Sequence, residues 1–243
     1  MSAVWSLYLP LFVVCLSIPR SGAQEDDSKC LPKSLDKCGS DYFLFNHQEK
    51  IATGDMETKK QCDLFMDQIT CTNQVVKSCW SLLFSTIVSR ILHDLFTYID
   101  GTCTSGSPLN QLYKDATGCL NKAGPSIHKE TQDFRMRLHS VAKDVSYKDR
   151  IDYACCAYST FRKQAMDVVN KECPGDDKAM RLYDDMFNQT VGRGIMPACA
   201  GFDWDTMWCK ALPQVSSTVD AKQTEGLAGP IHDILKSWEI KYT

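Results

Sequence analysis

The sequence predicts an all-α extracellular protein, organised as a disulfide-stapled bundle of helical hairpins. Three observations predict this class. Twelve cysteines follow an apolar N-terminal segment, apolar side chains recur every three or four positions, and no stretch alternates between polar and apolar residues as a strand would. With 243 residues and 44% hydrophobic side chains, the chain can bury a sizeable core, which excludes disorder for most of its length.

Residues 1–23 have the features of a secretory signal peptide. The apolar run from Leu7 to Leu16 is too short to cross a bilayer as a helix. Small residues follow at Ser21 and Ala23, where signal peptidase requires them, so we expect cleavage after Ala23 and secretion of the mature chain. The alternative is an N-terminal membrane anchor. After cleavage, 26 basic side chains stand against 30 acidic ones, a balance that argues against binding to nucleic acid or anionic lipid.

The cysteines of the mature chain are even in number and spread along its whole length. In an exported protein such a set is typical of disulfides, here about six. Metal ligation is the alternative, but the chain has no C-x-x-C pair of the kind that structural zinc sites use. Adjacent Cys155 and Cys156 cannot easily pair with each other, so we expect them to tie their helix to two different partners. The predicted disulfide cysteines are Cys30, Cys38, Cys62, Cys71, Cys79, Cys103, Cys119, Cys155, Cys156, Cys173, Cys199 and Cys209.

The spacing of eight of these cysteines suggests a duplicated unit, with copies near residues 56–119 and 148–209. The interval of 17 residues that starts at Cys62 recurs from Cys156, and the following intervals are 24 and 26, then 16 and 10. Such spacing suits a helical hairpin that is stapled beyond its second helix. Coincidence is the alternative, because the side chains between the cysteines match poorly.

The first half of the mature chain predicts two helices and two breaks. Apolar residues recur at helical spacing from about Met56 to Cys79. The next segment, residues 80–99, is the most apolar of the mature protein, and its charged side chains favour a buried core helix over a membrane span. A short segment over residues 109–117 is expected to stop at Gly118, and Gly124-Pro125 is expected to open a second break.

The second half predicts three further helices before a change in composition. Phe134 to Val145 has an amphipathic pattern, and a helical face continues from Ile151 to Cys173. Pro174-Gly175 then ends that helix, and Asp176-Asp177 can cap the next one. The disulfide-rich helical domain therefore covers residues 24–212.

Two C-terminal segments follow this domain. Residues 213–229 are rich in Ser, Thr, Gln, Ala and Gly, and this composition is typical of a linker. Residues 230–243 form a last helix that begins at Pro230. We expect it to dock on the main body rather than to wait for a partner, because a short helix gains most of its stability from packing.

The sequence lacks the short motifs that carry common enzyme chemistry, among them G-x-S-x-G, H-E-x-x-H, G-x-G-x-x-G and the P-loop. Cys155-Cys156 invites comparison with secreted phospholipases A2, but no His-Asp pair follows it to activate water. We therefore predict no enzyme, no cofactor and no metal site. The histidines stand singly, as surface or helix-end residues: His47, His93, His128, His139 and His232. The acidic pairs fit capping and surface charge better than calcium ligation: Asp176-Asp177, Asp184-Asp185 and Asp203/Asp205.

Two features point to extracellular binding roles. Asn188 begins the only N-x-S/T sequon of the mature chain, so it is a predicted glycosylation site, with an unused sequon as the alternative. Large apolar side chains are expected on the inner faces of the helices, where they fill a dry core or enclose a pocket for a hydrophobic ligand. These side chains are Trp80, Phe84, Phe96, Tyr158, Phe161, Phe187, Trp204 and Trp208.

Several cysteines and their neighbours resemble the arthropod hemolymph glycoprotein family of about this size. The likeness is carried by Cys155-Cys156-Ala157-Tyr158 with Phe161-Arg162 and Cys173, and by the run from Pro197 to Phe202. It covers residues 62–209. The resemblance implies an all-helical, secreted, glycosylated body-fluid protein with no catalytic residues to transfer. A more distant similarity to the cysteine-rich secreted helical domains of nematodes implies the same class.

The expected function is that of a secreted, non-enzymatic body-fluid glycoprotein that binds or carries a hydrophobic small ligand. A secreted inhibitor or toxin-like effector, which would bind an extracellular protein partner, is the alternative. Neither hypothesis requires nucleic acid or a transmembrane segment after signal cleavage.

Overall fold

The computed structural model describes residues 32–41, 43–189, 199–213, 215 and 226–242, and this part of the chain contains helices and no strands. The predicted all-α class is therefore confirmed. The expected signal segment 1–23 and Cys30 lie outside the described residues. The helices are α1 (Pro32–Asp36), α2 (Asp55–Cys79), α3 (Leu82–Cys103), α4 (Pro108–Asp144), α5 (Arg150–Glu172), α6 (Asp177–Phe187), α8 (Met207–Ala211) and α9 (Ala228–Tyr242).

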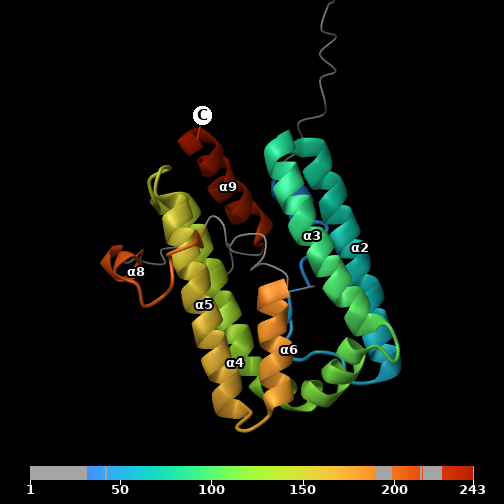
Figure 1. Cartoon of the computed structure of the whole chain (residues 1–243). Helices are drawn as coiled ribbons and strands as arrows, with labels where there is room; N and C mark the ends of the chain where they lie inside the picture. Colours follow the sequence, from blue (N-terminus) through green and yellow to red (C-terminus); the bar gives the residue numbers. More distant parts are fainter. Residues whose placement is uncertain (1–31, 42, 190–198, 214, 216–225, 243) are drawn as a thin grey trace, which may run out of the picture.

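Two long helical hairpins, α2–α3 and α4–α5, form the two sides of the molecule (Figure 1). Figure 1 shows α6 and α9 between them, with α9 toward the top of the view and α6 toward the bottom. Both of these shorter helices pack against α4 and α5. The hydroxyl of Tyr98 on α3 also donates to the carbonyl of Leu182 on α6, at 3.0 Å, so α6 contacts both hairpins.

The α2–α3 hairpin follows the predicted helices closely, but α3 is not the buried core helix that its composition suggested. Its buried side chains lie on one face, where Leu92, Leu95 and Ile99 meet Phe65 and Ile69 of α2. The opposite face leaves several apolar side chains in solvent, and 28% of the most apolar window of α3 is buried. By length and composition it is the one helix of the described residues that could cross a membrane, a property that core helices of soluble proteins share.

Helix α4 corrects the two breaks expected at Gly118 and Gly124-Pro125, because it runs without interruption through all three residues. Gly124 is required by tertiary contact: a Cβ built there would lie 2.0 Å from the carbonyl oxygen of Glu49. Pro125 is exposed to solvent. Figure 1 shows that α4 is bent, its first part crossing the base of the view before the helix turns upward behind α5. Sharp bends of this kind occur at prolines inside helices.

The main core lies where α4, α5 and α6 meet, and it is rich in aromatic rings. Phe134 of α4 stacks on Phe161 of α5 with ring centroids 4.6 Å apart. Phe187 of α6 meets Phe161 edge to face at 5.5 Å, and Tyr183 meets Phe187 in the same way at 5.1 Å. As predicted, Asp176 caps α6, because its side chain accepts the backbone N–H of Ala179 at 3.0 Å.

Helix α9 docks on the main body, as its amphipathic pattern predicted. It packs against α1, α4 and α5, and Ile234 contributes to a buried cluster with Leu138 and Val141 of α4. Leu227, just before α9, belongs to the same cluster. Most of the expected linker lies outside the described residues.

Five disulfides join described cysteines: Cys38–Cys71, Cys62–Cys103, Cys119–Cys173, Cys155–Cys199 and Cys156–Cys209. Cys79 is disulfide-bonded as well. Adjacent Cys155 and Cys156 tie α5 to two different partners, which confirms that expectation. The pairing does not follow the suggested duplication. Cys62 pairs with Cys103, the third cysteine of its series, whereas Cys156 pairs with Cys209, the fourth of its own. Cys119 and Cys173 join one series to the other.

Candidate functional site

A small apolar cavity lies between the α2–α3 hairpin, α4 and α6. Its volume of about 30 Å³ is room for a water-sized group. Its walls include Phe65, Leu95, Tyr98, Ile99, Tyr113 and Met186. Around this cavity the large apolar side chains are closely packed.

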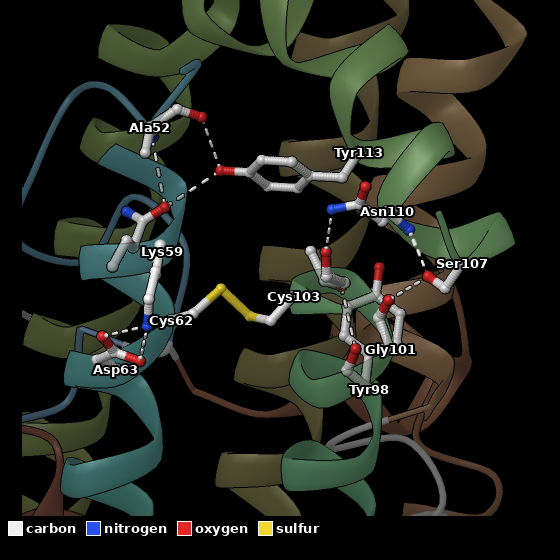
Figure 2. The surroundings of a disulfide bond; sticks show 12 residues. Ala52, Lys59, Cys62, Asp63, Tyr98, Gly101, Cys103, Ser107, Asn110 and Tyr113 are labelled. Atoms are coloured by element: carbon white, nitrogen blue, oxygen red, sulfur yellow. Dashed lines mark hydrogen bonds and ion pairs between the residues drawn. A yellow bond between two sulfur atoms is a disulfide. The ribbon is translucent and has the colours of Figure 1, made fainter. Parts of the chain in front are cut away.

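Hydrogen-bonded polar groups lie at the edge of this cavity, beside the Cys62–Cys103 disulfide (Figure 2). The Tyr113 hydroxyl donates to the carbonyl of Ala52 at 2.9 Å and lies 3.1 Å from Oε1 of Gln61. The side-chain amide of Asn110 donates to the carbonyl of Thr102 at 2.7 Å. Burial raises the pKa of the Tyr113 phenol well above its ordinary value, so this hydroxyl keeps its proton and remains a donor.

A larger, open cleft of about 390 Å³ lies between the segment 41–52, here called the N-terminal loop, and the first half of α2. Ala52 and Gln61 belong to both its wall and the network around Tyr113. The cleft is lined by Asp41, Leu44, Phe45, Asn46, His47, Gln48, Lys50, Ile51, Ala52, Glu57, Lys60, Gln61, Leu64 and Phe65.

Helix α4 holds the N-terminal loop at several points. The Asn121 side chain accepts the N–H of Ile51 at 2.7 Å and donates to its carbonyl at 2.9 Å, as a neighbouring strand would. One turn of helix later, Gly124 lets the Glu49 carbonyl approach. One turn further, Nδ1 of His128 lies 2.7 Å from the carbonyl oxygen of Phe45 and donates to it. One wall of the cleft is therefore fixed by the main core.

The N-terminal loop stores backbone strain at Phe45. Its φ of 62° lies in the left-handed region, which a bulky residue adopts at a cost of about 1–3 kcal/mol. The Phe45 ring is buried in the main core, 6.4 Å from the ring of Tyr183, and its carbonyl accepts from His128. The core contact and the hydrogen bond together offset the strain. Residues held in this way occur often at ligand sites, so the loop is suited to binding.

The floor of the cleft is an ordered polar network. The Asn46 side chain is 2% exposed, and its Nδ2 donates to Oγ of Ser40 at 2.9 Å. Nε2 of His47 lies 3.1 Å from the same Oγ. At the start of the loop, Gln68 of α2 accepts the backbone N–H of Asp41 at 2.9 Å. This bond fixes the start of the loop against α2, whereas the contacts of Ser40 connect the loop to the residue that precedes it.

The lining of the cleft combines apolar surface with charges of both signs. Leu64 offers apolar surface, whereas Lys50, Lys60 and Glu57 are exposed around it. Acidic and basic groups therefore occur together, and they give no strong net field. The arrangement suits a small amphipathic molecule whose apolar part covers Leu64 while its polar part meets the charged side chains.

Two histidines lie within α4, where the sequence suggested surface or helix-end positions. Both are half-buried. Nδ1 of His128 lies 2.7 Å from the carbonyl oxygen of Phe45, and Nε2 of His139 lies 2.8 Å from that of Gly226. A histidine ring suits this place because one nitrogen can donate while the apolar body packs. His47 and His93 are exposed as expected. Among the described residues, no three His, Cys, Asp or Glu side chains gather closely enough to hold a metal ion.

The acidic pairs take capping and ion-pair roles where they are described. Asp176 caps α6, Asp184 pairs with Arg162 at 2.7 Å, and Asp185 lies 3.6 Å from Arg181. Asn188 is exposed at the end of α6, and its side-chain N–H donates to Asp184 at 2.9 Å. Thr190, the third residue of the sequon, lies outside the described residues.

Three of the eight large apolar side chains expected on inner faces are exposed. Phe84, Phe161 and Phe187 are buried, and Trp80 and Tyr158 are half-buried. Phe96, Trp204 and Trp208 are exposed instead. Phe96 lies off the buried face of α3, and the tryptophans belong to a segment around α8 that disulfides hold, so an aromatic residue there does not have to reach the core.

Sequence reasoning missed the residues that fix the cleft, namely Asn121, Gly124 and His128. Their spacing of three and four residues along an otherwise apolar helical face was the available signal. The chain matches no protein-family model, no curated protein and no solved structure. The resemblance to arthropod hemolymph glycoproteins therefore stays a prediction.

Proposed function

We propose that the protein is a secreted, non-enzymatic binding protein of an extracellular fluid, which carries a small amphipathic ligand in the cleft between the N-terminal loop and α2. The observation that supports this most is the cleft itself. Its volume of about 390 Å³ falls within the range of small-molecule sites, roughly 300–1,000 Å³. One of its walls is held by hydrogen bonds from α4, so little ordering is required when a ligand binds.

The disulfides support the extracellular part of the proposal. Five described disulfides spread over residues 38–209 require an oxidising compartment, which for most chains is the secretory route or the space outside the cell. The signal-like residues 1–23 and the resemblance to body-fluid glycoproteins favour the same assignment.

The lining of the cleft favours an amphipathic ligand over a wholly apolar one. The apolar cavity between the α2–α3 hairpin, α4 and α6 measures about 30 Å³, which is too small for an organic ligand. In the open cleft, Lys50, Glu57 and Lys60 stand beside Leu64. A ligand with one apolar part and one polar or charged part would satisfy both kinds of lining.

Native mass spectrometry of the protein purified from its source tests the proposal directly. We expect a bound molecule of small mass that is lost on mild denaturation. A bare protein mass would contradict the carrier function. A protein partner bound in fixed ratio would favour the inhibitor or effector alternative.

A pair of matched variants ties the ligand to the cleft. Leu64→Trp adds bulk inside the cleft, whereas Leu83→Trp adds the same bulk on the exposed face of α3. With 8-anilinonaphthalene-1-sulfonate as an amphipathic probe, we expect at least tenfold weaker binding in L64W and unchanged binding in L83W. Equal binding by all three proteins would contradict the assignment of the cleft.

A further inference from the structure

Ser40 and His47 lie side by side at the cleft, although they are seven positions apart in the chain. Two turns fold the chain between them. The N–H of Phe43 donates to the carbonyl of Ser40 at 3.2 Å, and the N–H of Asn46 donates to the carbonyl of Phe43 at 3.0 Å. Ser40 is half-buried, whereas His47 is exposed and lines the cleft. A molecule in solution can therefore reach this pair of side chains.

The hydrogen bonds of Asn46 determine which atoms of the pair carry protons. Its amide nitrogen Nδ2 lies 2.9 Å from Oγ of Ser40, 3.0 Å from Nε2 of His47 and 3.3 Å from the carbonyl oxygen of Ser40. The reverse orientation of the amide would place Oδ1 against that carbonyl oxygen, so Nδ2 is the atom that faces all three. An amide nitrogen only donates hydrogen bonds. Nε2 of His47 therefore accepts, and it is unprotonated.

The hydroxyl proton of Ser40 is directed at an imidazole nitrogen that can take it. Oγ of Ser40 and Nε2 of His47 are 3.1 Å apart, within the range of roughly 2.6–3.2 Å that joins a nucleophile to its general base. Because Oγ accepts from Asn46, its own hydrogen is left for Nε2. Asn46 is 2% exposed and holds both atoms in this arrangement. The geometry is that of an activated serine nucleophile.

The backbone of Ser40 can stabilise the negative charge that an attack by Oγ creates. Its N–H has no hydrogen-bond partner among the described residues. In serine proteases the N–H of the nucleophilic residue donates to the oxyanion of the tetrahedral intermediate. Within the described part of the chain, no carboxylate bonds to Nδ1 of His47 as in a complete triad. The base is therefore less firmly oriented than in a triad, and the reaction should be slow.

We propose that Ser40 is an acyl-acceptor site, at which a carboxylic ester transfers its acyl group to Oγ with His47 as the general base. In this step Oγ attacks the ester carbonyl carbon, and the hydroxyl proton moves to Nε2 of His47. The bond between that carbon and the leaving alkoxide oxygen then breaks, and Nε2 returns the proton to this oxygen. The inference goes beyond the carriage of a ligand and does not depend on it.

Incubation of the full secreted chain with p-nitrophenyl acetate tests the proposal. We expect release of one equivalent of p-nitrophenolate, and peptide mapping should locate the acetyl group on Ser40. Ser40→Ala and His47→Gln should react more slowly by a factor of about 100, the low end of what a general base contributes. Ser146→Ala and His93→Gln are the matched controls. Each removes an exposed side chain of the same type elsewhere, so both should react like the wild type.

A rescue experiment separates the chemistry of His47 from a structural role. The variant His47→Ala opens space beside Oγ that is continuous with the cleft, so added imidazole should restore part of its reactivity. A failure of this rescue would overturn the role of His47 as the base. The proposal as a whole would be overturned by equal reaction of Ser40→Ala and the wild type, or by an acetyl group on lysine or tyrosine in place of Ser40. Circular dichroism establishes that each variant is folded.

Two readouts distinguish this proposal from the proposed function. Unchanged binding of 8-anilinonaphthalene-1-sulfonate together with an unreactive wild type would overturn the acyl-acceptor site and leave the ligand cleft in place. Release of p-nitrophenolate beyond one equivalent, lost in Ser40→Ala, would support the nucleophile and extend its reaction to hydrolysis. That second result would contradict the non-enzymatic part of the proposed function.

Discussion

Helix α6 and the segment Cys199–Pro213, here called the α8 loop, both lie against α5, yet they are attached in opposite ways. Of the 11 residues of α6, five are buried, including Leu182, Tyr183 and Phe187, and the helix contains no cysteine. The helix in the α8 loop buries none of its residues and depends on two disulfides. Packing uses apolar side chains to hold a segment, whereas a disulfide holds it and leaves those side chains available.

The two faces of α5 explain this division. Phe161, Ala165 and Val169 lie in the main core, where they meet α4 and α6. Cys155 and Cys156 near the start of the helix are buried as well, but their bonds lead out to the α8 loop. A single helix thus supports one neighbour through its core and another through covalent bonds.

The largest expected loss of stability comes from a substitution in α6. Leu182→Ala removes a fully buried side chain from α6 and should lower the free energy of unfolding by about 2–5 kcal/mol. Met207→Ala, the matched change in the α8 loop, should stay within about 0.5 kcal/mol. Urea unfolding of both variants measures the difference. Equal losses would mean that the α8 loop is packed as firmly as α6.

Removal of disulfides should separate the two regions again. The double variant Cys119→Ser/Cys173→Ser lacks the disulfide between α4 and the end of α5, and we expect a loss of about 2–4 kcal/mol of stability. Cys156→Ser/Cys209→Ser should cost less, because the native α8 loop gains freedom that offsets part of the effect in the unfolded chain. Limited proteolysis should instead cut this second variant first within residues 199–213. Early cleavage elsewhere would argue against the comparison.

Alkaline pH should lower the stability of the packed helices, because their buried tyrosines would have to ionise. Burial raises the pKa of Tyr158 to about 12, and burial also holds the pKa of Tyr98, Tyr113 and Tyr183 above the ordinary value of 10. Each folded-state pKa exceeds the unfolded one, so the stability from these neutral phenols is complete below pH 10 and is lost as the pH rises through the folded-state pKa. Absorbance at about 295 nm follows phenolate formation. Ionisation of these four phenols near pH 10 without unfolding would contradict their burial.

A smaller effect of opposite sign is expected inside α6. The Tyr183 hydroxyl is fully buried and has no hydrogen-bond partner among the described residues. Tyr183→Phe removes this unsatisfied group at nearly constant shape, so we expect the protein to become more stable by about 1 kcal/mol. Thermal unfolding measures the change. A clear destabilisation would show that the hydroxyl has a partner, such as a bound water molecule.

The smallest effect concerns Asn188, at the end of α6. Its side chain is exposed, so Asn188→Gln should change stability by less than about 0.5 kcal/mol. If the sequon is used, enzymatic deglycosylation will lower the mass of the wild type and leave the variant unchanged. An identical mass before and after treatment would mean that Asn188 carries no glycan.

Local sequence patterns predicted the segments whose ends are set by local chemistry. The cap at Asp176, the stop at Pro174-Gly175 and the divergent pairing of Cys155 and Cys156 all depend on near neighbours. Patterns failed at Gly124, where a carbonyl 75 positions earlier in the chain fixes the residue and keeps α4 continuous. They also missed the cleft, because its wall depends on long-range hydrogen bonds.

Trp208 shows a second limit of the sequence. An aromatic side chain is expected in the core, because burial is its usual source of stability. The neighbouring Cys209 changes that expectation once it pairs with Cys156, but connectivity cannot be derived from spacing. The exposure of Trp208 can therefore be understood only when the disulfides are known.

The described disulfides also divide the chain in the order of its synthesis. Cys38–Cys71 and Cys62–Cys103 close within residues 38–103, the other three close within residues 119–209, and none of the five joins these two ranges. The N-terminal part of a secreted chain enters the oxidising compartment first. The two described bonds of the α2–α3 hairpin therefore need no cysteine from α4 or from any later helix. A chain that ended after Cys103 would already contain both partners of each of these two bonds.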